Sequence, residues 1–139
     1  MQAGATNTFS PNSAVRVAGG STLDLNGFNQ TLNNGLTNAG TVQLPAFPGV
    51  SAPGTILTVN NYVGNNGALV LNTFLGADNS PSDKLVINGG AADPSVMHIF
   101  NVGGPGAETT ANGILVVQAI NGGMTEPGAF ALALSLIHI

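Results

Sequence analysis

Residues 85–90 of the chain read Leu-Val-Ile-Asn-Gly-Gly, a short run of β-forming apolar residues that ends in asparagine and glycine. Similar runs recur at residues 23–27, 41–44, 57–61, 69–72, 97–101 and 115–118, and residues 119–123 follow directly after the last one. Successive runs begin 12 to 18 residues apart. Several short strands at regular spacing predict a β-sandwich, a β-barrel or a solenoid.

The same runs argue against helices. Apolar residues nowhere recur at spacings of three and four over three turns, and glycine or asparagine interrupts nearly every window. Both residues are poor helix formers. The chain is therefore predicted to be all-β.

Composition favours the solenoid among the β architectures. Of 139 residues only eight are charged: Arg16 and Lys84 are basic, and six residues are acidic. A sandwich or small barrel usually covers its solvent face with charged side chains. The chain instead has 20 glycines and 17 asparagines, which tolerate the left-handed backbone found at the corners of stacked coils. We expect a right-handed parallel β-helix, with the hand taken from the general preference of parallel crossovers.

Stacking of coils makes two further predictions. Six asparagines follow strand-like runs, and we expect their side chains to hydrogen-bond from coil to coil: Asn26, Asn60, Asn72, Asn88, Asn101 and Asn121. At a coil spacing of about 4.8 Å, six or so coils would form a rod about 30 Å long.

Alternation along the strands predicts which side chains face the core. Leu85, Ile87, Leu115 and Val117 are expected to be buried, and Val86 and Val116 to be more exposed, because a slip of one residue would exchange the two faces.

Proline and glycine divide the chain into segments. Residues 45–54 are too rich in proline for a central strand and are predicted to be a loop between two parts of the solenoid, residues 12–44 and 55–133. Further loops are expected at residues 76–83, 103–113 and 122–128. Residues 1–11 are expected to be disordered or the remnant of an upstream repeat.

Charge and cysteine content exclude several kinds of site. Two cations cannot supply the several phosphate contacts that nucleic-acid binding requires, so no nucleic-acid partner is expected. The chain has no cysteine, which excludes disulfides, thiolate metal sites and cysteine nucleophiles. No uninterrupted apolar stretch reaches the roughly 18 residues of a membrane-spanning helix.

One loop contains a group of possible calcium ligands, Asp78, Asn79, Ser80 and Asp83. Their spacing matches neither the EF-hand loop nor the glycine-rich nonapeptide repeat that binds calcium. We interpret the group as a polar turn, and no metal site is predicted.

Catalytic chemistry is not indicated either. His98 would point to solvent if Met97 and Ile99 point inward, and it has no partner of the kind that a metal centre or a general base requires. The acidic residues lie in separate runs, and Arg16 and Lys84 are far apart in sequence, unlike the paired carboxylates and cations of polysaccharide-cleaving β-helices. We therefore predict no catalytic residue, no cofactor and no enzymatic activity.

Four stretches resemble, in the same order, the C-terminal end of the passenger in bacterial autotransporters. They are residues 54–72 (GTILTVNNYVGNNGALVLN), 78–90 (DNSPSDKLVINGG), 101–110 (NVGGPGAETT) and 113–123 (GILVVQAINGG). Residues 12–32 also look like a repeating strand unit of such a passenger. The resemblance covers most of residues 12–132 and is to the pertactin-like region that directly precedes the translocator barrel.

This resemblance implies a non-catalytic stem of a β-helical passenger that is exported by type V secretion to the bacterial outer surface. It also implies a segment that helps the rest of the passenger to fold, with the protein's own C-terminal translocator barrel as partner. Strands of such a barrel are not seen in the sequence, so we expect a fragment. Two alternatives stay open: an adhesive or fibre-like solenoid that binds a surface or glycan, and a polysaccharide-degrading β-helix.

The last six residues, 134–139, read LSLIHI. This is the translation of CTG TCT CTT ATA CAC ATC, which resembles a transposon-based sequencing adaptor. We expect the genuine sequence to end near Ala133; the alternative is a true apolar strand.

Overall fold

Short β-strands form the regular secondary structure of the protein. The computed structural model describes residues 1–108, 110–111 and 113–133, and within them it contains strands and no helix. The predicted adaptor sequence, residues 134–139, lies outside the described residues. The strands are β1 (Val15–Val17), β2 (Thr22–Asp24), β3 (Gln30–Leu32), β4 (Leu36–Asn38), β5 (Thr41–Gln43), β6 (Ile56–Val59), β7 (Tyr62–Val63), β8 (Ala68–Thr73), β9 (Lys84–Ile87), β10 (Gly90–Ala92), β11 (Ser95–Asn101), β12 (Val117–Ala119), β13 (Met124–Thr125) and β14 (Phe130–Leu132).

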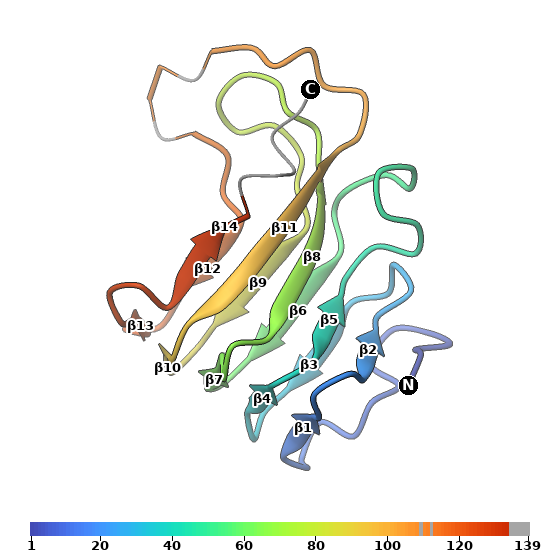
Figure 1. Ribbon diagram of the computed structural model, residues 1–139, viewed down its shortest axis with the longest axis vertical. Helices are drawn as coiled ribbons and strands as arrows, with labels where there is room; N and C mark the ends of the chain where they lie inside the picture. Colours follow the sequence, from blue (N-terminus) through green and yellow to red (C-terminus); the bar gives the residue numbers. More distant parts are fainter. Residues whose placement is uncertain (109, 112, 134–139) are drawn as a thin grey trace.

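The strands stack into three parallel sheets. The first sheet has the order β1-β4-β7-β10-β13, the second β2-β5-β8-β11-β14, and the third β3-β6-β9-β12. The chain passes through the three sheets in turn, so one coil takes one strand from each, and Figure 1 shows the coils stacked from the N-terminal to the C-terminal end. The protein is a parallel β-helix, as predicted.

The number of coils differs from the prediction. Four complete coils are followed by β13 and β14, whereas six or so coils were expected. The predicted runs lie in the second and third sheets, so from the second coil on each coil contains two of them. Paired residues of successive coils, such as Leu36 with Tyr62 and Leu57 with Leu85, are 26 and 28 residues apart.

The core lies between the three sheets and consists of ladders of inward side chains. In the second sheet Leu23, Val42, Leu69 and Met97 occupy successive steps of one ladder, and each is at most 5% exposed. Burial of apolar surface at every step makes each coil depend on its neighbours, which is how solenoids are stabilised.

The predicted strand phase is confirmed for β9 and is partly wrong for β12. Leu85 and Ile87 are fully buried and Val86 between them is half-buried. Val117 pairs with Leu85 and is half-buried, but Leu115 is 43% exposed. Val116, which was expected to be the more exposed residue, is half-buried and packs against the core. Leu115 precedes the strand, so the strand alternation does not extend to it.

Three of the four predicted loops contain no strand in the part of the chain that the structure describes. Residues 45–54 connect β5 to β6, residues 76–83 lie between β8 and β9, and residues 103–113 lie between β11 and β12. The prediction for residues 122–128 is wrong in part, because Met124 and Thr125 form β13 and pair with Gly90 and Ala91. This strand is set by its neighbour in the stack rather than by local β propensity.

The N-terminal segment, residues 1–14, lies along the first coil (Figure 1). Ala3 and Phe9 are buried in the core. The buried side chain of Gln30 accepts a hydrogen bond from the Phe9 N–H (3.2 Å) and donates one to the Ala5 carbonyl (2.8 Å). The segment that was expected to be disordered or an upstream remnant is thus bonded to the coil that follows it.

Candidate functional site

The long connections of the solenoid all leave the second sheet and enter the third. They are the second-coil loop (residues 44–55), the third-coil loop (74–83) and the fourth-coil loop (102–116). Because the strands that flank them are stacked, the loops lie at the same corner of successive coils (Figure 1). We call this region the loop corner.

Asn72, in β8 of the third coil, binds the second-coil loop. Its side chain is fully buried, and its Nδ2 donates to the carbonyls of Phe47 (3.1 Å) and Ser51 (2.7 Å). Its Oδ1 accepts from the Gly49 N–H (2.8 Å). The predicted bond from coil to coil is therefore present, but its partners are backbone groups of a loop and not another asparagine.

Asp83, at the end of the third-coil loop, binds the end of the same second-coil loop. Its Oδ1 accepts from the N–H groups of Gly54 (2.8 Å) and Thr55 (2.9 Å), and its Oδ2 accepts from the Asn72 N–H (2.8 Å). Burial raises the pKa of this carboxyl, and hydrogen bonds from the three N–H groups act in the opposite direction. Both carboxylate oxygens are occupied by backbone donors.

Asp78 binds the fourth-coil loop in a comparable way. Its Oδ2 accepts from the N–H groups of Thr110 (2.8 Å) and Ala111 (3.1 Å), and its Oδ1 from that of Gly113 (2.6 Å). These backbone donors hold the pKa of the Asp78 carboxyl below its ordinary value.

The four possible calcium ligands therefore do not converge. The carboxylates of Asp78 and Asp83 bind different loops, Asn79 adopts a left-handed turn (φ 62°), and Ser80 Oγ donates to the Ala77 carbonyl (2.6 Å). No group of three or more histidine and acidic side chains that could hold a metal is found among the residues whose structure is described.

Asn101, at the end of β11, repeats the arrangement of Asn72 one coil later. Its Oδ1 accepts from the Leu75 N–H (3.1 Å) of the third-coil loop and from the Gly104 N–H (2.9 Å). Gly104 lies so close to Leu75 that a Cβ atom would be 2.2 Å from the Leu75 nitrogen. The fourth coil therefore packs directly onto the third-coil loop.

Among the six predicted asparagines, one direct amide pair between coils is described. Asn121 Nδ2 donates to Asn88 Oδ1 (2.8 Å), and Asn26 instead donates to the Ala3 carbonyl (3.3 Å). Asn61 was not predicted, although its Oδ1 accepts from the Gly90 N–H (2.9 Å) of the next coil. Its position just before a short apolar pair, Tyr62 and Val63, was the available signal.

Sequence reasoning missed a group of buried side chains around Tyr62. We call Tyr62 and its partners Asn38, Ser95 and Phe130 the Tyr62 column. The Tyr62 side chain is fully buried, and its hydroxyl hydrogen-bonds to Ser95 Oγ (2.7 Å) and accepts from Asn38 Nδ2 (3.1 Å). Its ring stacks on Phe130 with 5.6 Å between centroids. Burial raises the pKa of Tyr62. The column joins the second coil to β14, and its polar groups are all paired, as a buried network requires.

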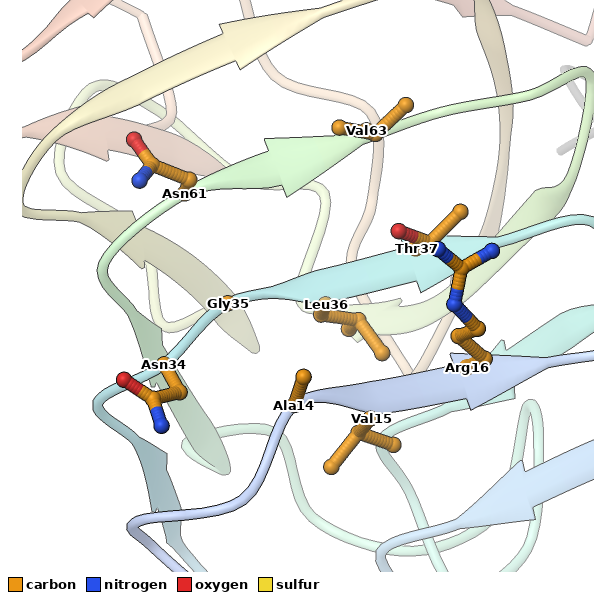
Figure 2. Close-up of a pocket in the computed structure, with 9 residues that line it drawn as sticks. All are labelled: Ala14, Val15, Arg16, Asn34, Gly35, Leu36, Thr37, Asn61 and Val63. Atoms are coloured by element: carbon orange, nitrogen blue, oxygen red, sulfur yellow. The ribbon is translucent and has the colours of Figure 1, made fainter.

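The predicted isolated residues lie away from the loop corner. His98 is half-buried on β11 and pairs with Val70 of β8. Its neighbours face the core: Met97 is buried in it and Ile99 packs against it. Arg16 lines a groove of about 130 Å³ on the first sheet. Figure 2 shows Arg16 beside Thr37, with Val63 on the next strand and with Asn34 and Asn61 just before the strands. No acidic residue lines this groove.

Membrane-spanning helices are likewise not found in the described residues. Several polar side chains act together at the loop corner and around Tyr62, and in both regions they bind one coil to the next.

Comparison with known proteins gives a family match over most of the chain. Residues 30–138 match the model of the family described as Autochaperone Domain Type 1. The uncharacterized protein YuaQ of Escherichia coli is 44% identical over 68% of this chain and 6% of YuaQ. The probable autotransporter YfaL of Escherichia coli is 41% identical over 65% of this chain and 7% of YfaL. The adhesin BmaC autotransporter of Brucella suis is 42% identical over 55% of this chain and 2% of BmaC. The chain therefore spans only a small part of each of these relatives.

Proposed function

Because the chain belongs to the Autochaperone Domain Type 1 family, we propose that it promotes the folding of the β-helical passenger of an autotransporter during its export across the outer membrane. The role that the family supports directly is a passenger-associated one in an autotransporter. The proposed promotion of folding is supported by the contacts of the first coil.

One observation carries this proposal: the chain that precedes the first coil is hydrogen-bonded to that coil along its length. Residues 1–14 precede the first strand, β1. Within them the Ala3 N–H donates to the Asp24 carbonyl (2.8 Å) and the Asn7 N–H donates to the Asn29 carbonyl (2.9 Å). Gln30 adds its two side-chain bonds to the same segment. A folded coil presents unpaired strand edges and an open core, and these are what an incoming coil needs in order to pair.

The proposal is tested by deleting residues 54–133 from the full-length precursor. We expect the translocator barrel to insert as before and the upstream passenger to become unfolded and protease-sensitive. A passenger that stays protease-resistant in the deleted precursor would show that the segment is a passive stem.

A pair of point variants tests whether the effect of the deletion comes from the loss of the folded coils or only from the shorter chain. Leu57 is fully buried in β6, and Thr58, the next residue, is half-buried on the opposite face. Leu57→Asp is expected to reproduce the deletion because it places a charge in the core. Thr58→Asp is the control and is expected to leave the passenger resistant.

We further propose that the complete protein is displayed at the outer surface, with its own translocator barrel as partner, and that this segment is non-catalytic. The two carboxylates with the most extensive hydrogen bonding, Asp78 and Asp83, are occupied by backbone N–H groups, which supports a structural role for them.

An adhesive solenoid is the second candidate function, because one relative is named an adhesin. The similarity covers 2% of that protein, so the name adhesin describes a much longer chain. Binding of the purified segment to host cells or glycans, compared with binding of the upstream passenger, would distinguish the two candidates.

A further inference from the structure

The second-coil loop has few means of ordering itself. Phe47 is 67% exposed and Val50 is 74% exposed, so the loop buries little apolar surface at these positions. Hydrogen bonds within the loop join only Phe47, Val50 and Ser51. The Phe47 carbonyl accepts from the Val50 N–H (3.1 Å), the Ser51 N–H (3.0 Å) and Ser51 Oγ (3.1 Å), and Ser51 Oγ accepts from the Phe47 N–H (3.1 Å). Ordering a connection of this length costs conformational entropy, so contacts from outside the loop are needed.

Those contacts are distributed unequally between the two neighbouring coils. From the first coil, Gly27 donates its N–H to the Leu44 carbonyl (3.0 Å) at the start of the loop, and Asn29 Oδ1 accepts from the Ile56 N–H (2.8 Å) just beyond its end. From the third coil, Asn72 binds the middle of the loop and Asp83 binds its end. Asn72 and Asp83 also bond to each other, through the Asn72 N–H (2.8 Å).

The third-coil loop has internal bonds, such as that from the Phe74 N–H to the Pro81 carbonyl (2.9 Å), and is also bonded to the coil that follows it. Asn101 of the fourth coil binds Leu75 N–H, and the Leu75 carbonyl accepts from the Gly106 N–H (2.7 Å). In both cases a loop is held by side chains or backbone of the next coil toward the C-terminus.

We propose that Asn72 and Asp83 form a loop clamp, through which the third coil fixes the second-coil loop, so that the second coil becomes ordered only after the third. This inference rests on the proposed function and deepens it, because it names the residues that give the folding template a C-to-N direction. Asn72 and Asp83 are positioning residues in this scheme: they hold the middle and the end of the loop so that β5 and β6 are aligned with β8 and β9.

The clamp is tested by hydrogen exchange measured peptide by peptide in the complete protein. In Asn72→Ala, amides of residues 45–55 are expected to exchange at least tenfold faster, whereas peptides covering β10 and β11 keep wild-type rates. Asp83→Asn is expected to give a smaller increase in exchange rate. The asparagine Oδ1 can still accept from the N–H groups of Gly54 and Thr55, whereas its Nδ2 is a donor and cannot accept from the Asn72 N–H.

Asp78→Asn is the matched control. It removes a carboxylate that also binds three backbone N–H groups, but those belong to the fourth-coil loop. This variant is expected to accelerate exchange near residues 110–113 and to leave residues 45–55 unchanged. Wild-type rates at residues 45–55 in both clamp variants would overturn the proposal, as would an equal acceleration of exchange in β10 and β11.

The direction is tested by a symmetric pair of core variants. Leu23 of the first coil and Leu69 of the third coil flank Val42 of the second coil in one ladder. Leu69→Ala is expected to release the second-coil loop, and Leu23→Ala is expected to leave its exchange unchanged. Equal release in the two variants would overturn the directional claim, whereas the protease resistance of the passenger reports separately on the proposed function.

Discussion

Asp78 and Asp83 lie five residues apart in one loop, and their contributions to stability change with pH in opposite directions. Burial raises the pKa of Asp83, so the folded protein binds that proton more tightly than the unfolded chain does. The contribution of Asp83 to stability is therefore complete below its unfolded pKa of about 3.9 and is lost as the pH rises through its folded pKa. The backbone donors lower the pKa of Asp78, so its contribution is present above the unfolded pKa and is lost as the pH falls through the folded one.

We expect substitution to reveal these opposite slopes. The difference in urea midpoint between the parent protein and Asp83→Asn should be largest at acidic pH and should shrink as the pH rises from about 3 toward 7. For Asp78→Asn the difference should instead grow over the same range. Urea titrations at several pH values measure both, and parallel slopes in the two variants would contradict the assignment.

Tyr62 is the residue whose hydroxyl joins three coils, since it bonds to Asn38 and Ser95. Tyr62→Phe keeps the ring and its stacking on Phe130 but leaves buried polar partners unpaired, which should cost about 1–3 kcal/mol of unfolding free energy. Ser95→Ala, combined with it in a double-mutant cycle, should show a non-additive loss. Additive losses in chemical denaturation would mean that the hydroxyl pair contributes nothing of its own.

At the scale of strands, the predicted runs found most strands of the second and third sheets, but not β3 or β14, and found no strand of the first sheet. The predicted runs contain Leu, Val and Ile in alternation, as β5, β6, β8 and β9 do. In the first sheet, β7 has two residues and β10 reads Gly-Ala-Ala, so neither has a local β signal. These strands exist because neighbouring coils pair with them in register, and single-sequence patterns do not report such long-range pairing.

The loop corner was predictable in the same partial way. Asparagine directly after a strand-like run did indicate a bond between coils for Asn72. Its partners, Phe47 and Ser51, are 25 and 21 residues away, and the length of the intervening connection fixes which backbone groups it meets. No local pattern could assign Asp83 its three donors, because two of them lie 28 and 29 residues away.

A strand of the third sheet gives a sharp test of the register. Leu85 is fully buried and Val86 is half-buried on the other face of β9. Leu85→Asp should cost several kcal/mol because an unpaired charge enters the core. Val86→Asp, the matched control, should stay within about 1 kcal/mol of the parent. Denaturation midpoints check the pair, and a reversed order would show that the two faces are exchanged.

For the molecule as a whole, burial falls toward the C-terminal coil. The second and third coils contain fully buried positions in every sheet, whereas the strand residues of β12, β13 and β14 are all half-buried or exposed. Within the described residues these three strands pair on one side only. Among the described residues, the side chains of Val117 and Phe130 also line an opening beside Met97.

An open edge of this kind predicts the behaviour of residues 1–133 expressed alone. Unpaired parallel strands and an open core are sites of edge-to-edge association, so we expect aggregation or marginally cooperative unfolding. Extension with the native continuation of the chain should raise the stability markedly, since it would cover β12–β14. Ala131 is exposed on β14, and Ala131→Lys should reduce light scattering without restoring cooperative unfolding, because a charge blocks the edge but adds no core. A monomeric, cooperatively unfolding 1–133 would show that the terminal coil needs no cover.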